Sequence, residues 1–260
     1  MMLAVTCCFH FLWTTSAYGQ SDNCPANGNL QWATLNYIVD GDTLHLTDGR
    51  KVRVIAINTP ELGREHRSAQ PLADKARGAV KAFFASDAKV GLQLGVDDRD
   101  RHGRVLAHVF RSDGGNLAAF MLARGLAWHI VIPPNDRYGS CLADKETLAQ
   151  QQSLGIWHNN AYSLKEAKTL QLSDSGFQRV QGTVESVTRS RNGWWLQLGQ
   201  LAVRVRDKDL HNLEGFDPRQ LKNTSLLIRG WIVDRSQSTA VQQKGYSPLM
   251  MDLRHSAMLK

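Results

Sequence analysis

Cysteine is scarce in this chain of 260 residues, and its four copies form no metal-binding pattern. No Cys-x-x-Cys or His-x-His spacing occurs in the sequence. A structural zinc site needs several such ligands at close spacing, so the sequence argues against one. The apolar run from Leu3 to Trp13 is also too short to cross a bilayer as a helix. We therefore expect neither a zinc-stabilised protein nor a membrane-bound one.

Basic residues are absent from the N-terminal end, where the first Lys or Arg is Arg50. The basic flank that usually precedes a secretory signal is therefore missing. Even so, the apolar run is followed by Ala17-Tyr18-Gly19, which has small residues at the two positions that a signal peptidase reads. We predict a signal peptide over residues 1–19 and export to the periplasm or the extracellular space. A buried apolar N-terminal strand or helix is the alternative.

Removal of such a signal would leave two of the four cysteines, Cys24 and Cys141. An even number of cysteines in an exported chain is typical of disulfide bonding. The sequence therefore predicts a bridge between Cys24 and Cys141, with two free thiols as the alternative reading.

Apolar patterns divide the chain into a first part, residues 29–158, and a second part, residues 177–260. In the first part, β-branched runs predict strands and helical periodicity predicts helices. The expected strands are Gln31–Val39, Thr43–Leu46, Lys51–Ile57, Lys89–Asp97 and Val105–Phe110. The expected helices are Pro71–Ala85, Asn116–Arg124 and Leu142–Leu154.

The second part follows a polar linker, Ser173 to Gly176. Its expected strands are Arg179–Thr188, Trp194–Leu198, Leu201–Val205, Ser225–Val233 and Leu249–Leu253, with a helical insert in Leu210–Leu221. Short strands at this spacing suggest a small all-β barrel or sandwich. This second part of the chain loosely resembles an OB-fold nucleic-acid-binding module.

Positive charge is concentrated in the second part. The chain carries a formal net charge of +7, and residues 161–260 hold 15 Lys and Arg against 9 Asp and Glu. Arginines alternate there with tryptophans, as in a groove that tracks a nucleic-acid backbone and stacks bases. The residues concerned are Arg189, Arg191, Trp194, Trp195, Arg204 and Arg206. A solvated basic sheet face over an aromatic core is the alternative.

Several short motifs in the first part carry the chemistry. They are Asp40-Gly41-Asp42-Thr43, Arg53, Asn58-Thr59-Pro60-Glu61 and Asp100-Arg101-His102-Gly103-Arg104. Carboxylates, amide oxygens and backbone carbonyls are ligands for a hard cation, and arginines clamp phosphate oxygens with a fork of donors. Together these groups are the parts needed to hydrolyse a phosphodiester.

In these motifs the chain resembles the staphylococcal nuclease (thermonuclease) family. The resemblance spans roughly Leu35 to Trp157 and also includes Leu122 to Ala127 and the closing Gly155-Ile156-Trp157. It implies a mainly β fold with helices: a five-stranded OB-type barrel with three helices, here followed by the small all-β part. It also implies a calcium-dependent nuclease acting on DNA, RNA or both, and no protein partner.

The resemblance assigns a role to each motif residue. Asp42, Asn58 and the Thr59 carbonyl match the metal ligands, and Asp40 matches an acidic neighbour of that site. Pro60 biases Thr59 towards an extended backbone, which helps to aim the carbonyl. The acid that orients or deprotonates the attacking water falls on Glu61. The two phosphate-binding arginines fall on Arg53 and Arg104.

Two positions depart from the family pattern. Asn58 replaces a metal carboxylate, so the site has one negative charge fewer, and another divalent cation could take the place of Ca²⁺. The family's tyrosine pair beside the nucleotide falls in Ile130-Val131-Ile132-Pro133, which contains no aromatic residue. Both departures would also fit a non-catalytic nucleic-acid-binding module with a decayed site. The sequence retains Glu61, however, and binding alone does not need a general base.

Overall fold

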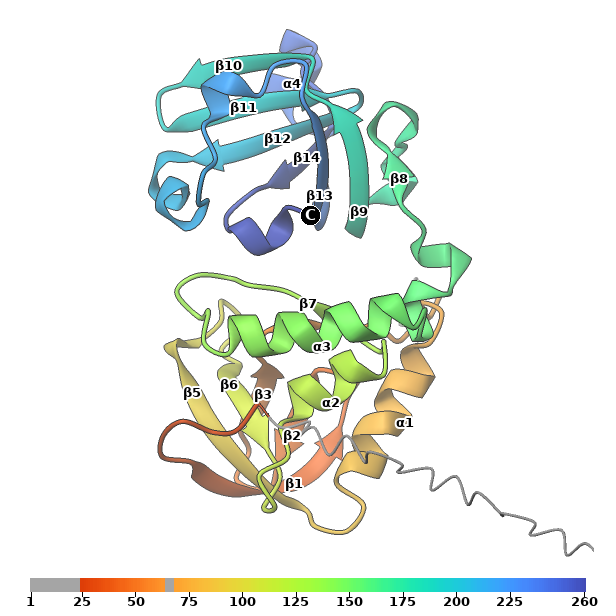
Figure 1. Ribbon diagram of the computed structural model, residues 1–260, viewed down its shortest axis with the longest axis vertical. Coiled ribbons are helices and arrows are strands. Elements are labelled where there is room, and N and C mark those ends of the chain that lie inside the picture. The colour runs from red at the N-terminus through yellow and green to blue at the C-terminus, as the bar shows by residue number, and fades with distance from the viewer. Residues whose placement is uncertain (1–23, 64–67) are drawn as a thin grey trace, which may run out of the picture.

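The computed structural model describes residues 24–63 and 68–260. They form two parts, each around a separate apolar core, and the chain crosses once from one to the other (Figure 1). The predicted signal peptide, residues 1–19, lies outside the described residues. No helix among the described residues is long and apolar enough to cross a membrane.

A closed five-stranded barrel forms the centre of the first part, in the strand order β1-β2-β3-β6-β5. The strands are β1 (Gln31–Ile38), β2 (Thr43–Leu46), β3 (Lys51–Val54), β5 (Lys89–Arg99) and β6 (Val105–Phe110). Side chains along a strand point alternately to its two faces. In β2 and β3 the inward side chains, such as Leu44, Leu46 and Val52, are accordingly more buried than their neighbours. This confirms the expected mainly β fold with an OB-type barrel and helices.

Three α-helices pack beside the barrel: α1 (Ala73–Phe83), α2 (Leu117–Ala123) and α3 (Gly139–Gln151). The Asn116 side chain caps α2 by accepting the Ala119 N–H (3.2 Å). The third helix begins three residues before the expected Leu142 and ends at Gln151. The structure joins Cys24 to Cys141 at the start of α3, the disulfide that the sequence predicts.

The strand expected over Lys51–Ile57 is interrupted. Ala56 has φ of 70°, a left-handed conformation that a β-strand cannot continue through. The chain therefore leaves the barrel after Val54 and forms a separate short strand, β4 (Ile57–Asn58). This strand pairs with β7 (Trp128–His129), with Asn58 opposite Trp128 and Ile57 opposite His129. The kink carries residues 58–61 away from the sheet.

The second part is built on one seven-stranded sheet, in the order β10-β11-β12-β14-β13-β9-β8. Its two ends, β10 and β8, do not pair, whereas the first sheet closes on itself. The strands are β8 (Lys165–Glu166), β9 (Gly176–Thr183), β10 (Ser186–Ser190), β11 (Gly193–Leu198), β12 (Leu201–Arg206), β13 (Ser225–Asp234) and β14 (Leu249–Asp252).

Two local expectations for the second part were wrong, and one helix was missed. The strand expected over Arg179–Thr188 is two strands, β9 and β10, because the chain turns at Val184 and Glu185. The expected helical insert in Leu210–Leu221 consists of two short 3₁₀ turns, Asp207–Asn212 and Pro218–Gln220. The helix α4 (Thr239–Lys244) was not predicted.

The two parts are joined by a buried ionic cluster. Glu146 of α3 is fully buried and lies 2.7 and 2.8 Å from Nη1 of Arg229 on β13. The Lys260 ammonium lies 3.2 Å from the same carboxylate, which also accepts a hydrogen bond from the backbone N–H of His129 (2.8 Å). Burial acts to raise the pKa of Glu146, but Arg229 and Lys260 outweigh burial and lower it. The carboxylate is therefore ionised, and the two parts share one charged core.

Candidate functional site

The acidic turn between β1 and β2 places two carboxylates side by side. The Asp42 N–H donates to Oδ1 of Asp40 (3.0 Å), and both residues are buried. Gly41 between them is in close contact with Thr59: a Cβ added at Gly41 would lie 2.8 Å from the Thr59 side chain. Glycine is therefore required for this turn to approach the segment that follows β4.

The Asp42 carboxylate is the centre of the site. Its Oδ2 accepts both the N–H (2.9 Å) and the hydroxyl (3.1 Å) of Thr59, and Arg53 forms an ion pair with it at 3.1 Å. Its Oδ1 accepts only the Thr43 hydroxyl (3.1 Å) among the hydrogen bonds of the described residues. A carboxylate has about four lone-pair sites, so Oδ1 retains acceptor capacity.

The kink after β3 fixes the Arg53 guanidinium. Its Nη1 donates to the backbone carbonyls of Val54 (2.6 Å) and Ile57 (2.9 Å), on either side of the positive-φ residue Ala56. These bonds hold the side chain along the kink while Nη2 reaches Asp42. A rigid fork of donors results, in the geometry that suits a phosphate or carboxylate.

The segment from Asn58 to Glu61 lies against this turn. Asn58 and Thr59 are buried, whereas Glu61 is exposed. The backbone of Glu61 is fixed by Gln70, because the Glu61 N–H donates to the Gln70 side chain (2.8 Å) and the Gln70 N–H donates to the Glu61 carbonyl (2.9 Å). The structure thus brings Asp40, Asp42, Arg53, Asn58 and Thr59 into one region, with Glu61 at its solvent side.

Negative charge accumulates in this cluster. Burial, then the neighbouring Asp42 carboxylate and Glu61, raise the pKa of Asp40 to about 6, although the Asp42 N–H and Arg53 act in the opposite direction. A buried carboxyl beside other carboxylates is held back from ionising unless a cation balances it. The site therefore has the electrostatic character of a cation site.

The donor set fits a hard cation that prefers oxygen. Among the described residues, no group of three or more His, Cys, Asp and Glu side chains could hold a metal ion. Such a group is not required here, because the Asn58 amide and the Thr59 carbonyl are oxygen donors of other kinds. With Asp42, these groups offer oxygen ligands and no nitrogen or sulfur, which favours Ca²⁺ or Mg²⁺ over Zn²⁺.

Arg104 is held by its own turn. Its N–H and Nε donate to Asp100 at 3.0 and 2.6 Å, and it precedes β6, which runs parallel to β3 with Val105 opposite Val52. Burial acts to raise the pKa of Asp100, but its hydrogen bonds from Arg104 outweigh burial and lower it. Arg104 thus directly precedes β6, which is the neighbour of β3, the strand that carries Arg53.

The six candidate residues of the second part do not form one surface. Paired residues of an antiparallel ladder share a face, and successive residues alternate. Arg189 is opposite Trp194, which packs against the second core, whereas Trp195 is opposite Arg204 on the other face. Trp195 lines a pocket together with Arg191, Arg204 and Arg206.

Most of these arginines are paired with acids. Arg189 makes two bonds of 2.9 Å to Asp207, and Arg206 lies 2.9 Å from Asp209. Arg204 binds Asp252 at 2.6 and 2.9 Å. Asp252 lies on the strand next to that of Arg204, and Asp207 and Asp209 lie in the 3₁₀ turn after β12, so part of the basic excess is neutralised locally.

One group of functional interest was missed by sequence reasoning: the cluster of Glu146, Arg229 and Lys260 with His129. Its partners are separated by 83 and 114 residues in the chain. A glutamate within a helix and an arginine within a strand carry no local signal of pairing at such distances. The one sequence hint is that a charged residue, Arg229, interrupts the apolar run Leu226–Val233.

Comparisons with known proteins find relatives of this chain. A family model described as staphylococcal nuclease homologue matches residues 51–159. The chain is 32% identical over 124 residues to the thermonuclease of Staphylococcus intermedius, covering 46% of this chain and 72% of that protein. It is 30% identical over 138 residues to the thermonuclease of Staphylococcus hyicus, covering 52% and 80%.

A third relative comes from another genus. The chain is 34% identical over 134 residues to the SPbeta prophage-derived endonuclease YokF of Bacillus subtilis strain 168. That match covers 50% of this chain and 45% of the relative. These three matches therefore account for about half of this chain.

Proposed function

Because the chain belongs to the staphylococcal nuclease family, we propose that it is an exported, metal-dependent nuclease that hydrolyses phosphodiester bonds in DNA, RNA or both. The observation that carries the proposal is the arrangement around Asp42. Arg53 and Thr59 both bind this carboxylate, and they reach it from segments that are fixed by the kink at Ala56. A turn with no function would not need two buried carboxylates side by side, as Asp40 and Asp42 are.

Asp42, Asn58 and the Thr59 carbonyl would hold the metal, with Asp40 as an acidic neighbour. We propose Ca²⁺, or another divalent cation because Asn58 contributes no charge. When bound, the ion supplies Lewis-acid stabilisation of a phosphoryl oxygen. The protein contributes the fixed positions of these oxygen donors, through the hydrogen bonds that Thr59 donates to Asp42.

Glu61, Arg53 and Arg104 are the proposed catalytic side chains. Glu61, exposed beside the acidic turn, orients a water molecule and accepts its proton. The guanidinium groups of Arg53 and Arg104 bind the phosphate oxygens, where negative charge grows in the transition state. Arg53 is already held in place by two backbone carbonyls, so little side-chain entropy is lost when it binds substrate.

The remaining expectations complete the proposal. The nuclease domain would be residues 29–158, and residues 177–260 would be a domain that aids nucleic-acid binding through Arg191, Arg204, Arg206 and Trp195. Export to the periplasm or extracellular space is supported by the Cys24–Cys141 disulfide, because such bonds persist in oxidising compartments.

The decisive experiment measures hydrolysis of single-stranded DNA and of RNA by the full chain, with and without excess chelator. We expect activity that the chelator abolishes and that Glu61→Gln lowers on the order of 10²-fold or more. Asp48→Asn, which alters an exposed turn acid, is the control and should retain full rate. Full activity in excess chelator would contradict the metal, and binding without any hydrolysis would indicate a non-catalytic module.

A further inference from the structure

A pocket lies where the two parts meet, and none of the proposed catalytic residues lines it. We call it the junction pocket; its volume is about 150 Å³. A cavity needs roughly 10–15 Å³ to hold one water, so the pocket could hold a group much larger than one structural water. Its walls come from β7 and the segment after it in the first part, and from β9, β13, the end of β14 and the chain after it in the second.

The rim of the junction pocket exposes apolar side chains. Ile132, Trp231 and Val233 all line it, and each exposes more than a third of its surface: 45%, 38% and 46%. The Phe177 ring packs edge-on against Trp231, with the ring centres 5.1 Å apart. Apolar surface gathered at one concave place in a soluble protein is typical of a binding site.

Two residues that line the pocket carry buried polar atoms without partners. Both ring nitrogens of His129 and Nη2 of Arg229 are buried and have no hydrogen-bond partner among residues 24–63 and 68–260. Buried polar groups nearly always have partners, so three orphaned atoms in the lining of one pocket require an explanation. Burial also lowers the pKa of His129 to about 4, so its ring is neutral and offers one donor and one acceptor.

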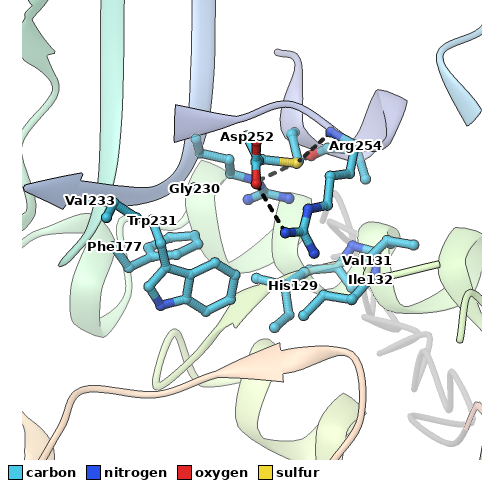
Figure 2. A pocket seen from close by; sticks show the side chains of 13 residues that line it. His129, Val131, Ile132, Phe177, Gly230, Trp231, Val233, Asp252 and Arg254 are labelled. Carbon is cyan, nitrogen blue, oxygen red and sulfur yellow. Dashed lines mark hydrogen bonds and ion pairs between the residues drawn. The ribbon is translucent and has the colours of Figure 1, made fainter. Parts of the chain in front are cut away.

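A guanidinium completes the lining. Arg254 binds Asp252 (3.0 Å) and, in Figure 2, extends from the second sheet towards the segment of Val131 and Ile132. The Trp231 indole stands on the other side of the same space (Figure 2). An indole and a guanidinium are both flat groups that stack on aromatic rings.

We propose that the junction pocket binds a base of the nucleic-acid substrate, so that the second part contributes directly to substrate binding. The inference rests on the proposed function. A nucleobase is flat and aromatic, and its edge carries both donors and acceptors. It therefore matches the flat faces of Trp231 and Arg254. An aliphatic peptide side chain has no flat face for such stacking.

The backbone connects this pocket to the catalytic site. His129 of β7 pairs with Ile57 of β4, and the next residue of β4 is Asn58, a proposed metal ligand. A strand of nucleic acid with its scissile phosphate at Asp42 and Arg53 could therefore place a base that lies further along the chain in the junction pocket. Stacking recognises any base, so we expect little sequence preference.

The first test is an NMR titration of the full chain in excess chelator, where no hydrolysis occurs. The indole N–H signal of Trp231 is identified by its loss in Trp231→Phe. We expect each of the four ribonucleosides to shift this signal saturably, and ribose to leave it unchanged. An unshifted signal up to the solubility limit, or an equal shift with ribose, would overturn the proposal.

The second test is kinetic. Trp231→Ala should raise KM for oligonucleotides about fivefold or more, the scale of one lost stacking interaction, and leave kcat nearly unchanged. KM for a dinucleotide, which has no further base along the chain to place in the junction pocket, should rise less. Trp32→Ala, which removes another half-exposed tryptophan on β1, is the matched control.

Arg254→Gln should raise the oligonucleotide KM in the same way, with Arg219→Gln, an exposed arginine paired with Asp217, as its control. An equal rise in KM for the dinucleotide, or none for either substrate, would overturn the proposal.

These experiments can refute the pocket and the nuclease activity independently of each other. A wild-type protein that cleaves nucleic acid but shows no nucleoside binding at Trp231 would refute the pocket alone, and binding without cleavage would refute the nuclease alone.

Discussion

The two parts of this molecule both pair arginines with acids, but they place their remaining acids differently. In the second part, which holds most of the positive net charge, acids pair with arginines, as Asp207 does with Arg189 and Asp252 with Arg204. In the first part, burial and then the neighbouring Asp42 and Glu61 carboxylates raise the pKa of Asp40 to about 6. The net charge of a region therefore does not locate its most reactive site, because local pairing decides how much of that charge remains available.

The comparison does not mean that the two parts are independent. Glu146 belongs to the first part, but the cations that balance it, Arg229 and Lys260, come from the second. Trp128 of β7 also contacts Phe177 of β9, with ring centres 5.2 Å apart. A chain cut after Asn160 would leave a buried carboxylate without its cations, so the role of the second part is best tested by substitutions in the full chain.

The largest effect is expected from breaking this shared cluster. Arg229→Met keeps the volume of the side chain but removes the nearer of the two cations that balance the buried Glu146, which should lower the free energy of unfolding by about 3–5 kcal/mol. Arg219→Met, in the exposed pair with Asp217, should cost at most about 1 kcal/mol. Urea unfolding curves of both variants measure the difference, and the double variant Glu146→Gln/Arg229→Met should recover part of the loss. Equal stabilities of the two arginine variants would show that the cluster does not hold the parts together.

A second comparison separates catalytic from structural arginines. Arg53→Ala should lower kcat by about 10²–10³-fold, the usual consequence of losing one preorganised donor to the transition state. Arg111→Ala removes an arginine of similar pairing, which binds Asp113 and the backbone carbonyl of Phe83, and should leave kcat within about a factor of two. Initial rates at saturating substrate give both values. A loss of the same size in both variants would mean that stability, and not phosphate binding, explains the effect of Arg53.

Acid should destabilise the first part through His108. Burial lowers the pKa of this histidine to about 4, with a small further effect of Arg137, so it is neutral when folded. The unfolded chain takes up a proton below pH about 6.5, and stability is therefore lost as the pH falls from about 6.5 to 4, by on the order of 3 kcal/mol at the bottom of that range. His108→Gln should flatten this part of the stability profile, whereas the surface variant His102→Gln should not. Parallel profiles for His108→Gln and the wild type would contradict the assignment.

The family resemblance predicted the barrel and the members of the Asp42 cluster, and it could be found because its strands and motifs are local in the sequence. Strands such as Thr43–Leu46 are short apolar runs between turns, and the Asp-Gly-Asp-Thr turn is contiguous. The kink at Ala56 was missed, since alanine gives no sign of a positive φ. The pairing of Glu146 with Arg229 was missed because it depends on how the two cores meet.

A smaller effect is expected at the metal site. Asn58 is buried next to Thr59 and brings an amide oxygen where a carboxylate would bring a charge. Asn58→Asp should lower the Ca²⁺ concentration for half-maximal activity by roughly tenfold, because the charge count of the ligands tunes affinity. Asn27→Asp, an asparagine near Tyr138 and outside the cluster, serves as control. An unchanged Ca²⁺ requirement in Asn58→Asp would show that residue 58 is not a ligand.

The smallest effect tests how much of the basic excess of the second part remains available. Among residues 24–63 and 68–260, no ion pair involves Arg191, whereas Arg189 is held by two bonds to Asp207. If the second part contacts phosphates, Arg191→Gln should reduce the slope of log affinity against log salt by about 0.7 for single strands, the release of one counterion. Arg189→Gln should change the slope much less, because its charge is already neutralised by Asp207. Binding is measured on full-length chains in excess chelator across a salt series.

If Arg189→Gln lowers the slope as much as Arg191→Gln, then the Arg189–Asp207 ion pair opens when nucleic acid binds. If neither variant changes the slope, these two arginines of the second part make no phosphate contact, and phosphate binding is confined to the first part.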